Sequence, residues 1–332
     1  MSHENPIIEL VRYGAFGDLL MATATFAGLK QQGYRVRFIC NRYFAPILRN
    51  NPYLDELIEL EESTHEAVEA SLAGKLPAER RVLLNFPTSP FGLFHPLGFP
   101  DHPIALPITE HYCREVRVPS TDELSLHLDS DVEEWGKSYT HTVLIHSQTA
   151  FSLYKNWAPD RWFYLANHLR EQFRVDVKVV GSPEDPPIQG VERLESPSLL
   201  HAIAALKHCK LFIGLDSVFN HASRAVKKPS IILWGSTNPL AFGYEQNINL
   251  VNGVVWQRAM GNDGPHLKCQ PCYRENKHMK ESLKPVCPNT RSYPYHALTE
   301  DVHPAPSLHA CMAANTVDVV FTHAAALLTA TP

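Results

Sequence analysis

The chain has 332 residues, 44% of them hydrophobic and 20% charged, and this length predicts two domains of roughly 150 residues rather than one core. The formal net charge of -5, with no run of basic residues, argues against nucleic acid as the main partner. No stretch reaches the ~20 apolar residues of a transmembrane segment, and the polar residues 1–6 do not resemble a signal peptide, so we expect a cytoplasmic protein.

The first half alternates strand-like and helix-like patterns, which is typical of a parallel sheet covered by helices. The predicted strands are residues 7–11, 35–40, 57–60 and 81–86, and the predicted helices are residues 19–31, 43–50 and 66–72. Closely spaced prolines exclude a long helix in residues 86–119, and we interpret this irregular segment as a substrate loop.

The second half restarts the same alternation. The predicted strands are residues 142–146, 175–180, 210–214 and 230–234, and the predicted helices are residues 159–173, 198–208, 217–226 and 315–328. The acidic stretch at residues 129–140 predicts the domain boundary. We therefore expect an α/β protein with two nucleotide-fold domains, residues 1–135 and 136–332.

Two strand-to-helix turns, about 200 residues apart, carry glycine and a carboxylate: residues 14–18 and 213–217. Helix N-termini attract anions, so each turn can bind phosphate. Their occurrence in opposite halves indicates two nucleotide-fold domains that face one cleft. Phe16 and Leu19 stand where the dinucleotide signature requires glycine, which disfavours a nicotinamide enzyme.

Asp18 lies at the mouth of the first turn, where it can act as a base or simply cap the helix. Thr149 and Lys155 follow the strand at residues 142–146; a hydroxyl and an ammonium group can bind phosphate oxygens, although Lys155 also suits an ordinary surface.

Asp216, Ser217 and His221 form a third group, at the second turn. Ser217 at a helix N-terminus can donate to phosphate, and His221, four residues on, shares its helix face. A packed helix histidine is the alternative interpretation of His221.

These motifs, in their order along the chain, resemble glycosyltransferase family 9, the ADP-heptose heptosyltransferases. The resemblance spans nearly the whole chain and rests on residues 17–20, 155–159, 181–185, 216–221 and 229–235. It implies the GT-B fold, with two Rossmann-like domains facing a central cleft. The N-terminal domain would bind the acceptor and the C-terminal domain the nucleotide sugar.

The resemblance also implies roles for single residues. Asp18 matches the proposed catalytic base, and Thr149 and Lys155 match positions that contact the donor phosphates. Glu184 or Asp185 falls where the family places an acid near the ribose. The motif around the donor diphosphate is matched by Asp216, Ser217 and His221. The chain departs from the family pattern at Val218, where glycine is usual, and at Ala24, where proline is common.

Seven cysteines in a chain of this kind do not indicate a disulfide framework. We expect Cys40, Cys113 and Cys209 to be small core residues. The other four fall in the segment 260–312 and fit a structural Zn or Fe site, with packed thiols as the alternative: Cys269, Cys272, Cys287 and Cys311. This cluster resembles the four-cysteine iron finger of autotransporter heptosyltransferases, the protein-modifying branch of the family.

We therefore expect an inverting glycosyltransferase that moves heptose from ADP-heptose to a hydroxyl of a surface glycan, a lipopolysaccharide core or a protein serine. It would need no catalytic metal, and a homo-oligomer is compatible with this interpretation. A nucleotide-sugar epimerase of the same fold is one alternative. A non-catalytic module that binds nucleotide sugar or assembles through a metal is another, although Asp18 and Lys155 together argue against it.

Overall fold

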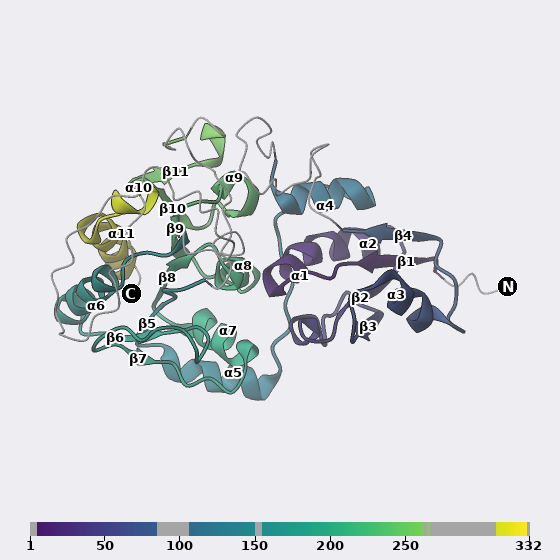
Figure 1. Cartoon of the computed structure of the whole chain (residues 1–332), viewed down its shortest axis with the longest axis horizontal. Coiled ribbons are helices and arrows are strands. Elements are labelled where there is room, and N and C mark those ends of the chain that lie inside the picture. The colour runs from purple at the N-terminus through teal and green to yellow at the C-terminus, as the bar shows by residue number, and fades with distance from the viewer. Residues whose placement is uncertain (1–4, 85–105, 150–154, 262–263, 266–309, 331–332) are drawn as a thin grey trace, which may run out of the picture.

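The computed structural model describes residues 5–84, 106–149, 155–261, 264–265 and 310–330. Two lobes, each built around its own sheet, lie side by side (Figure 1). The first sheet has four parallel strands in the order β3-β2-β1-β4. The second has seven strands in the order β11-β10-β9-β8-β5-β6-β7, parallel except for the β10–β11 pair.

The N-terminal lobe contains the strands that the hydrophobic pattern predicts. Its elements are β1 (Ile7–Val11), α1 (Phe16–Ala22), α2 (Phe26–Gln31), β2 (Arg35–Asn41), β3 (Glu56–Leu60), α3 (His65–Leu72), β4 (Arg80–Leu83) and α4 (Ile108–Val116). The predicted helix 19–31 starts earlier, at Phe16, and is divided by a 3-10 turn because the Thr23 and Thr25 hydroxyls donate to carbonyls three residues back. Residues 43–50 form only a 3-10 turn, Ala45–Ile47.

The segment that we expected to be irregular contains a helix that the proline pattern hid. Helix α4 begins directly after Pro107, so the last proline of the series precedes the helix rather than interrupting it. Its buried side, with Tyr112, Cys113 and Val116, packs into the core of the lobe. Residues 85–105, the rest of the predicted substrate loop, lie outside the described part of the chain.

The C-terminal lobe follows the predicted alternation closely. Its strands are β5 (Thr142–Ile145), β6 (Asp176–Val179), β7 (Glu192–Arg193), β8 (Leu211–Leu215), β9 (Ser230–Trp234), β10 (Ile248–Val251) and β11 (Val254–Trp256). Its helices are α5 (Ser130–Gly136), α6 (Pro159–Phe173), α7 (Leu199–His208), α8 (Val218–Ala225), α9 (Pro239–Phe242), α10 (Ala310–Ala313) and α11 (Val317–Ala330). Helix α6 has the predicted bounds, whereas α5, β7, α9, the β10–β11 hairpin and α10 were not predicted.

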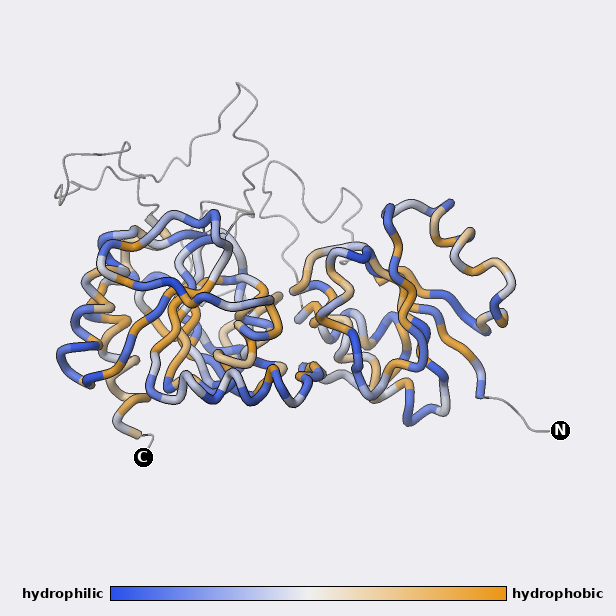
Figure 2. Tube along the Cα trace, turned by 90° about the horizontal axis from the view of Figure 1, so that it is seen from below, coloured by the Kyte–Doolittle hydropathy of each residue, from blue (hydrophilic) through white to orange (hydrophobic). Residues whose placement is uncertain are grey.

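The sheet of the C-terminal lobe is covered on both faces, as a parallel sheet requires. Val143 and Ile145 of β5 point toward α6 and α11, and Leu144 points to the opposite side, into the core that includes α7 and α8. Figure 2 shows the hydrophobic segments running through the interior of each lobe. Within the described residues, no helix combines the length and apolarity that a membrane crossing requires.

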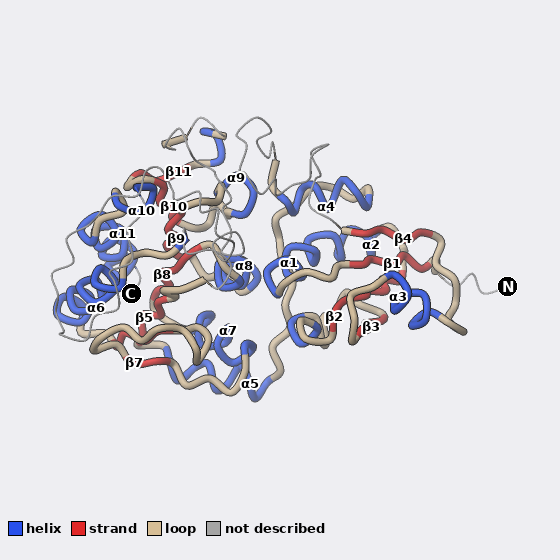
Figure 3. The backbone as a smooth tube through the Cα atoms, in the orientation of Figure 1, coloured by secondary structure: helices blue, strands red, loops and turns tan. Residues whose placement is uncertain are grey.

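The strand order fixes where the two lobes present their turns. β1 lies between β2 and β4, and β5 lies between β6 and β8, so each sheet has a point where the connections change direction. Ligands of open α/β sheets bind at such points, beyond the carboxyl ends of the strands. Helices α1 and α8, which follow β1 and β8, lie next to each other between the lobes (Figure 3).

Candidate active site

Asp18 is fixed by its own loop and by an arginine. It lies in the first turn of α1, where its Oδ2 accepts hydrogen bonds from the Ala15 amide at 3.2 Å and from Arg12 Nη2 at 2.6 Å. Arg12 also donates to the Leu84 carbonyl at 3.1 Å, which ties it to the end of the first sheet. Both bonds to Asp18 use one oxygen, and among the described residues Oδ1 makes no hydrogen bond. Asp18 thus supports the helix start, and its second oxygen is not used in that support.

Gly17 brings the two lobes into close contact. A Cβ atom at Gly17 would lie 2.7 Å from Cδ2 and 3.2 Å from Nε2 of His221, distances that a larger residue could not adopt without moving one helix. The glycine therefore lets α1 of the N-terminal lobe approach α8 of the C-terminal lobe. Asp18, the next residue of α1, therefore lies near this contact between the lobes.

Lys155 and Asp216 form a nearly buried ion pair in the C-terminal lobe. Lys155 Nζ lies 2.7 Å from Asp216 Oδ2, and the side chains are 11% and 5% exposed. Burial raises the pKa of Asp216, but the charges of Lys155 and His221 outweigh it, so the net pKa is lowered and the carboxylate stays ionised. Lys155 is thereby held at the carboxyl end of β8, where its ammonium group can meet an anionic ligand.

Ser217 is the N-cap of α8. Its hydroxyl accepts from the Phe219 amide at 3.2 Å and lies 3.1 Å from His146 Nδ1, so its proton can be donated to that ring. Burial lowers the pKa of His146 to about 4, which keeps the ring neutral near pH 7. The end of β5 and the start of α8 are joined by this contact.

His221 lies among the ionised groups that the sequence singled out. Its ring is buried, and Nδ1 is 2.7 Å from the Tyr244 hydroxyl. Burial lowers its pKa to about 4; the charges of Asp216 and Asp18 act in the opposite direction, and Lys155 adds to the lowering. His221 is thus packed on its helix, and charged groups of both lobes act on its ring.

Thr149 and the 181–185 loop follow strands β5 and β6 and are each held by local hydrogen bonds. The amide and hydroxyl of Thr149 donate to Asn156 Oδ1 at 2.9 and 3.2 Å, so Asn156 holds the residue in place. Asp185 Oδ2 accepts from the Ser182 amide at 2.8 Å and closes its own loop. Glu184 is exposed, and no hydrogen bond or ion pair of its carboxylate is found among the described residues. Both acids matched to the ribose position thus retain a carboxylate oxygen without a hydrogen bond among the described residues.

Two residues of the site were not found from the sequence. Arg12 follows β1 and has no motif around it, and Tyr244 lies 23 positions after its partner His221. The two departures from the family pattern take different places: Val218 is the half-buried first residue of α8, and Ala24 is buried in the core.

The cysteines divide between the described and the undescribed parts of the chain. Cys40, Cys113 and Cys209 are buried as predicted, and burial raises the pKa of Cys40 and Cys209 to about 12, so they are not reactive thiolates. Cys311 is buried in α10, against the core of the C-terminal lobe. The other three members of the predicted metal site lie outside the described residues: Cys269, Cys272 and Cys287. Among the residues that are described, no cluster of three or more His, Cys, Asp or Glu side chains could hold a metal.

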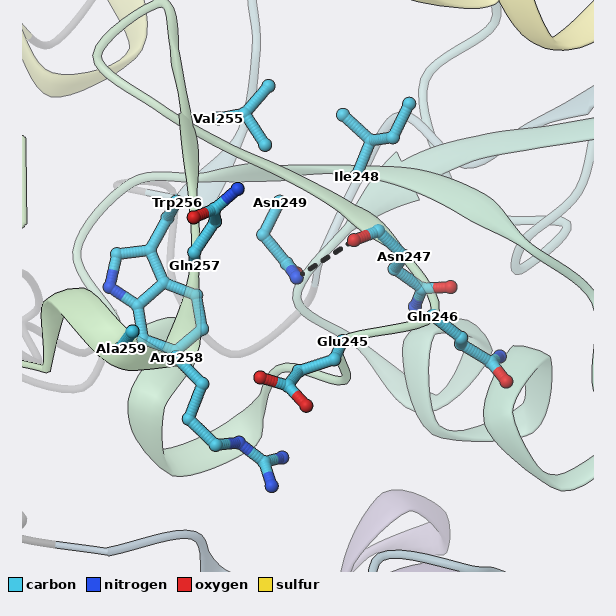
Figure 4. Close-up of a pocket in the computed structure, with 10 residues that line it drawn as sticks. All are labelled: Glu245, Gln246, Asn247, Ile248, Asn249, Val255, Trp256, Gln257, Arg258 and Ala259. Carbon is cyan, nitrogen blue, oxygen red and sulfur yellow. Dashed lines mark hydrogen bonds between the residues drawn. The ribbon is translucent and has the colours of Figure 1, made fainter.

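A separate cavity of about 410 Å³ lies beside the β10–β11 hairpin and is lined by residues 245–249 and 255–259 (Figure 4). None of the motif residues lines it. Its floor includes Asn249, whose Nδ2 donates to the Asn247 carbonyl at 3.2 Å. The group formed by Asp18, Lys155, Asp216 and His221 is therefore the better candidate for the active site.

Comparison with known proteins concerns the family and the fold of the chain. Residues 115–283, half of the chain, match the model of glycosyltransferase family 9 (heptosyltransferase). A search of curated proteins returns no match.

Similar solved structures cover almost the whole chain. The glycosyl transferase family 9 structure from Veillonella parvula has a TM-score of 0.65 at 16% identity and covers 100% of this chain and 99% of its own. E. coli ADP-heptose lps heptosyltransferase II has a TM-score of 0.65 at 15% identity, with coverage of 98% and 99%. The iron-containing dodecameric glycosyltransferase TibC from enterotoxigenic E. coli has a TM-score of 0.60 at 14% identity, with coverage of 99% and 77%; a complex of TibC with ADP-D-beta-D-heptose is also similar.

The two parallel sheets, in two lobes that meet at α1 and α8, are thus those of the GT-B heptosyltransferase structures, which confirms the predicted fold class. With half of its residues matched by the family model, the chain belongs to glycosyltransferase family 9, the heptosyltransferase family, and is a glycosyltransferase.

Proposed function

We propose that this enzyme is an inverting heptosyltransferase that uses ADP-heptose as donor and a hydroxyl group as acceptor. The observation that carries the proposal is the meeting of Asp18 from one lobe with Lys155, Asp216 and His221 from the other. The names of the E. coli relatives support the donor, since one is an ADP-heptose heptosyltransferase and TibC was determined with ADP-D-beta-D-heptose.

On the acceptor side, Asp18 is the base. Its Oδ1 takes the proton of the acceptor hydroxyl as the oxygen attacks the anomeric carbon, while Arg12 and the Ala15 amide hold Oδ2. Attack opposite the diphosphate inverts the anomeric carbon, and the electrons of the broken C–O bond leave with the diphosphate. General-base catalysis of this kind contributes about 10² to 10⁴-fold in rate.

On the donor side, the C-terminal lobe stabilises the departing diphosphate. Lys155 supplies a positive charge, and the start of α8 at Ser217 supplies hydrogen-bond donors and the positive end of the helix dipole. These groups are fixed before the reaction, so they stabilise developing charge without reorganising. Thr149, after β5, would contact the phosphates, and Glu184 or Asp185, after β6, would contact the ribose.

Mass spectrometry of reaction products tests the proposal. The purified enzyme is incubated with ADP-heptose and separate panels of lipopolysaccharide core, other glycans and serine peptides. We expect ADP together with one acceptor class that gains a heptose. An isomerised nucleotide sugar formed without acceptor would instead identify an epimerase, and no product from any panel would identify a non-catalytic module.

Replacing Lys155 with methionine should weaken the binding of ADP by about 10 to 100-fold, because a charge-assisted hydrogen bond to phosphate is lost. Isothermal titration calorimetry with free ADP measures this directly. Lys137→Met, which removes an exposed lysine directly after α5, is the matched control and should leave the affinity unchanged. Equal ADP affinity in Lys155→Met and wild type would remove Lys155 from the donor site.

The four clustered cysteines are proposed to bind one structural Zn or Fe ion. Four thiolates suit either metal in a tetrahedral site, and Cys311 is fixed in the buried helix α10, which would anchor such a site to the lobe. The similar structure TibC is described as iron-containing and dodecameric. Self-association of this chain stays a prediction, and so does its cytoplasmic location. The metal would favour the protein-modifying branch of the family.

Elemental analysis should find about one Zn or Fe per chain, and Cys287→Ser should release it and lower the melting temperature, because metal binding contributes to folding free energy. Cys40→Ala, which removes a buried thiol of the other lobe, is the control and should keep the metal. Freshly reduced protein without metal would exclude the site.

A further inference from the structure

The hydroxyl of Tyr244 and the ring of His221 form an isolated buried pair. Nδ1 of His221 lies 2.7 Å from the Tyr244 oxygen, and the two residues are 4% and 2% exposed. Among the described residues, the Tyr244 hydroxyl makes no other hydrogen bond. The hydroxyl and Nδ1 must therefore serve as hydrogen-bond partners of each other.

Counting protons selects one arrangement of this pair. A neutral imidazole has one N–H donor and one acceptor nitrogen, and a phenol has one proton. If Nδ1–H donated to the tyrosine oxygen, the phenol proton would be buried without an acceptor, which is costly. If the phenol donates to Nδ1, the phenol proton and Nδ1 are both satisfied, the ring proton lies on Nε2, and Nε2–H is the one donor of the pair left for a further acceptor.

The Nε2 side of the ring faces the other lobe. A Cβ atom at Gly17 would lie 3.2 Å from Nε2 and 2.7 Å from Cδ2, but 3.7 Å from Cγ, so this edge points toward α1. The charges of Asp18, Asp216 and Lys155 all act on the ring. Nε2 makes no hydrogen bond among the described residues.

The loop that carries Tyr244 is held rigidly. Asn249 Nδ2 donates to the Tyr244 carbonyl at 2.9 Å and to the Asn247 carbonyl at 3.2 Å, and Trp234 Nε1 donates to Asn249 Oδ1 at 2.9 Å. Figure 4 shows Asn249 directed at the turn between Glu245 and Asn247, directly after Tyr244. The tyrosine hydroxyl is therefore kept at a fixed position relative to β9 and β10.

We propose that Tyr244 is a positioning residue that holds His221 as the neutral Nε2–H tautomer, so that Nε2 donates a hydrogen bond to an anionic phosphate oxygen of the donor. The role assigned to Nε2 rests on the proposed function, whereas the tautomer does not. The tyrosine acts only through the histidine, and it touches no reacting atom.

Nitrogen-15 NMR of the histidine rings tests the tautomer in the absence of substrate. The His221 signals are assigned by their loss in His221→Gln, since the chain contains 18 histidines. Near pH 7 we expect a protonated Nε2 and an unprotonated Nδ1 in the wild type. Tyr244→Phe should produce a mixture of tautomers or the Nδ1–H form. A wild-type Nδ1–H tautomer, or a doubly protonated ring, would overturn the proposal even if the phenylalanine variant fails to fold.

Steady-state kinetics test whether the hydrogen bond from His221 Nε2 to the donor contributes to turnover. Tyr244→Phe should lower kcat by about 10-fold, the usual scale for one hydrogen bond, with a smaller change in KM for the donor. His221→Gln places an amide N–H near the Nε2 position and should keep more activity than His221→Asn, whose amide lies near Nδ1. Tyr34→Phe, which removes a hydroxyl bonded to Glu79 in the other lobe, is the matched control with unchanged kcat.

The outcomes separate the two proposals. If the predicted tautomer is found but no heptose is transferred to any acceptor, the proposed function fails and the tyrosine–histidine pair stands. If transfer occurs and Tyr244→Phe keeps both the tautomer and the turnover of the wild type, the positioning role is wrong.

Discussion

Asp18→Asn should reduce heptose transfer by about 10² to 10⁴-fold while ADP affinity stays close to that of the wild type. The amide keeps the size of the side chain, and its oxygen can still accept from the Ala15 amide, so the start of α1 is preserved. What is lost is a group that can take the acceptor proton. The amide is neutral, so the ion pair with Arg12 at 2.6 Å is also weakened to a hydrogen bond, whereas Oδ1 makes no other hydrogen bond among the described residues.

Turnover under saturating donor and acceptor, with calorimetry of ADP binding, measures the two effects separately. Asp131→Asn is the matched control, since Asp131 is an exposed acid in the first turn of α5 and should be neutral for turnover. If Asp18→Asn turns over at the wild-type rate, Asp18 only stabilises the helix start and the proposed mechanism is wrong.

Asp216→Ala should destabilise the protein by about 3–5 kcal/mol, because it leaves the Lys155 ammonium, 11% exposed, without its carboxylate. Removal of both charges in the double variant Lys155→Met, Asp216→Ala should recover most of this loss, since the unbalanced buried charge is then gone. Urea unfolding near pH 7 measures the difference. Glu192→Ala is the control: its carboxylate pairs with Lys178 but is 81% exposed, so the change should stay within about 0.5 kcal/mol.

The destabilisation by Asp216→Ala should depend on pH in a defined direction. The pKa of Asp216 is lowered from its ordinary value of 3.8 in the folded protein: burial raises it, but Lys155 and His221 outweigh that effect. The contribution of the carboxylate is therefore fully present above pH 3.8 and is lost as the pH falls through the folded pKa. The difference between wild type and variant should be constant from pH 5 to 8 and shrink below about pH 4. A difference that grows on acidification would contradict the ion pair as its source.

The sequence by itself determined the alternation of strands and helices. Helix α6 starts at Pro159 as predicted, because proline has no N–H to lose in a first turn. Helix α7 starts after Ser198, whose hydroxyl accepts from the His201 amide. The buried strands were readable as apolar runs. Such signals act between near neighbours, so they need no knowledge of the fold.

The sequence also determined which residues are candidates for chemistry, but it could not say which of them meet. Lys155 and Asp216 are 61 positions apart and form a pair only because β5 and β8 are neighbours in the sheet. The hydrogen bond from the Ser182 amide to Asp185, which closes the loop after β6, was likewise not foreseen from the sequence.

Only the tertiary structure decided the contacts between the lobes. Helix α4 follows a proline-rich stretch, and its buried residues show as a helix face only when the core beneath them is known. Gly17 meets His221, and Tyr244 meets the same ring from a loop with no motif. Local propensity acts over a few residues, whereas these contacts depend on how two sheets are packed, which no short segment of the chain specifies.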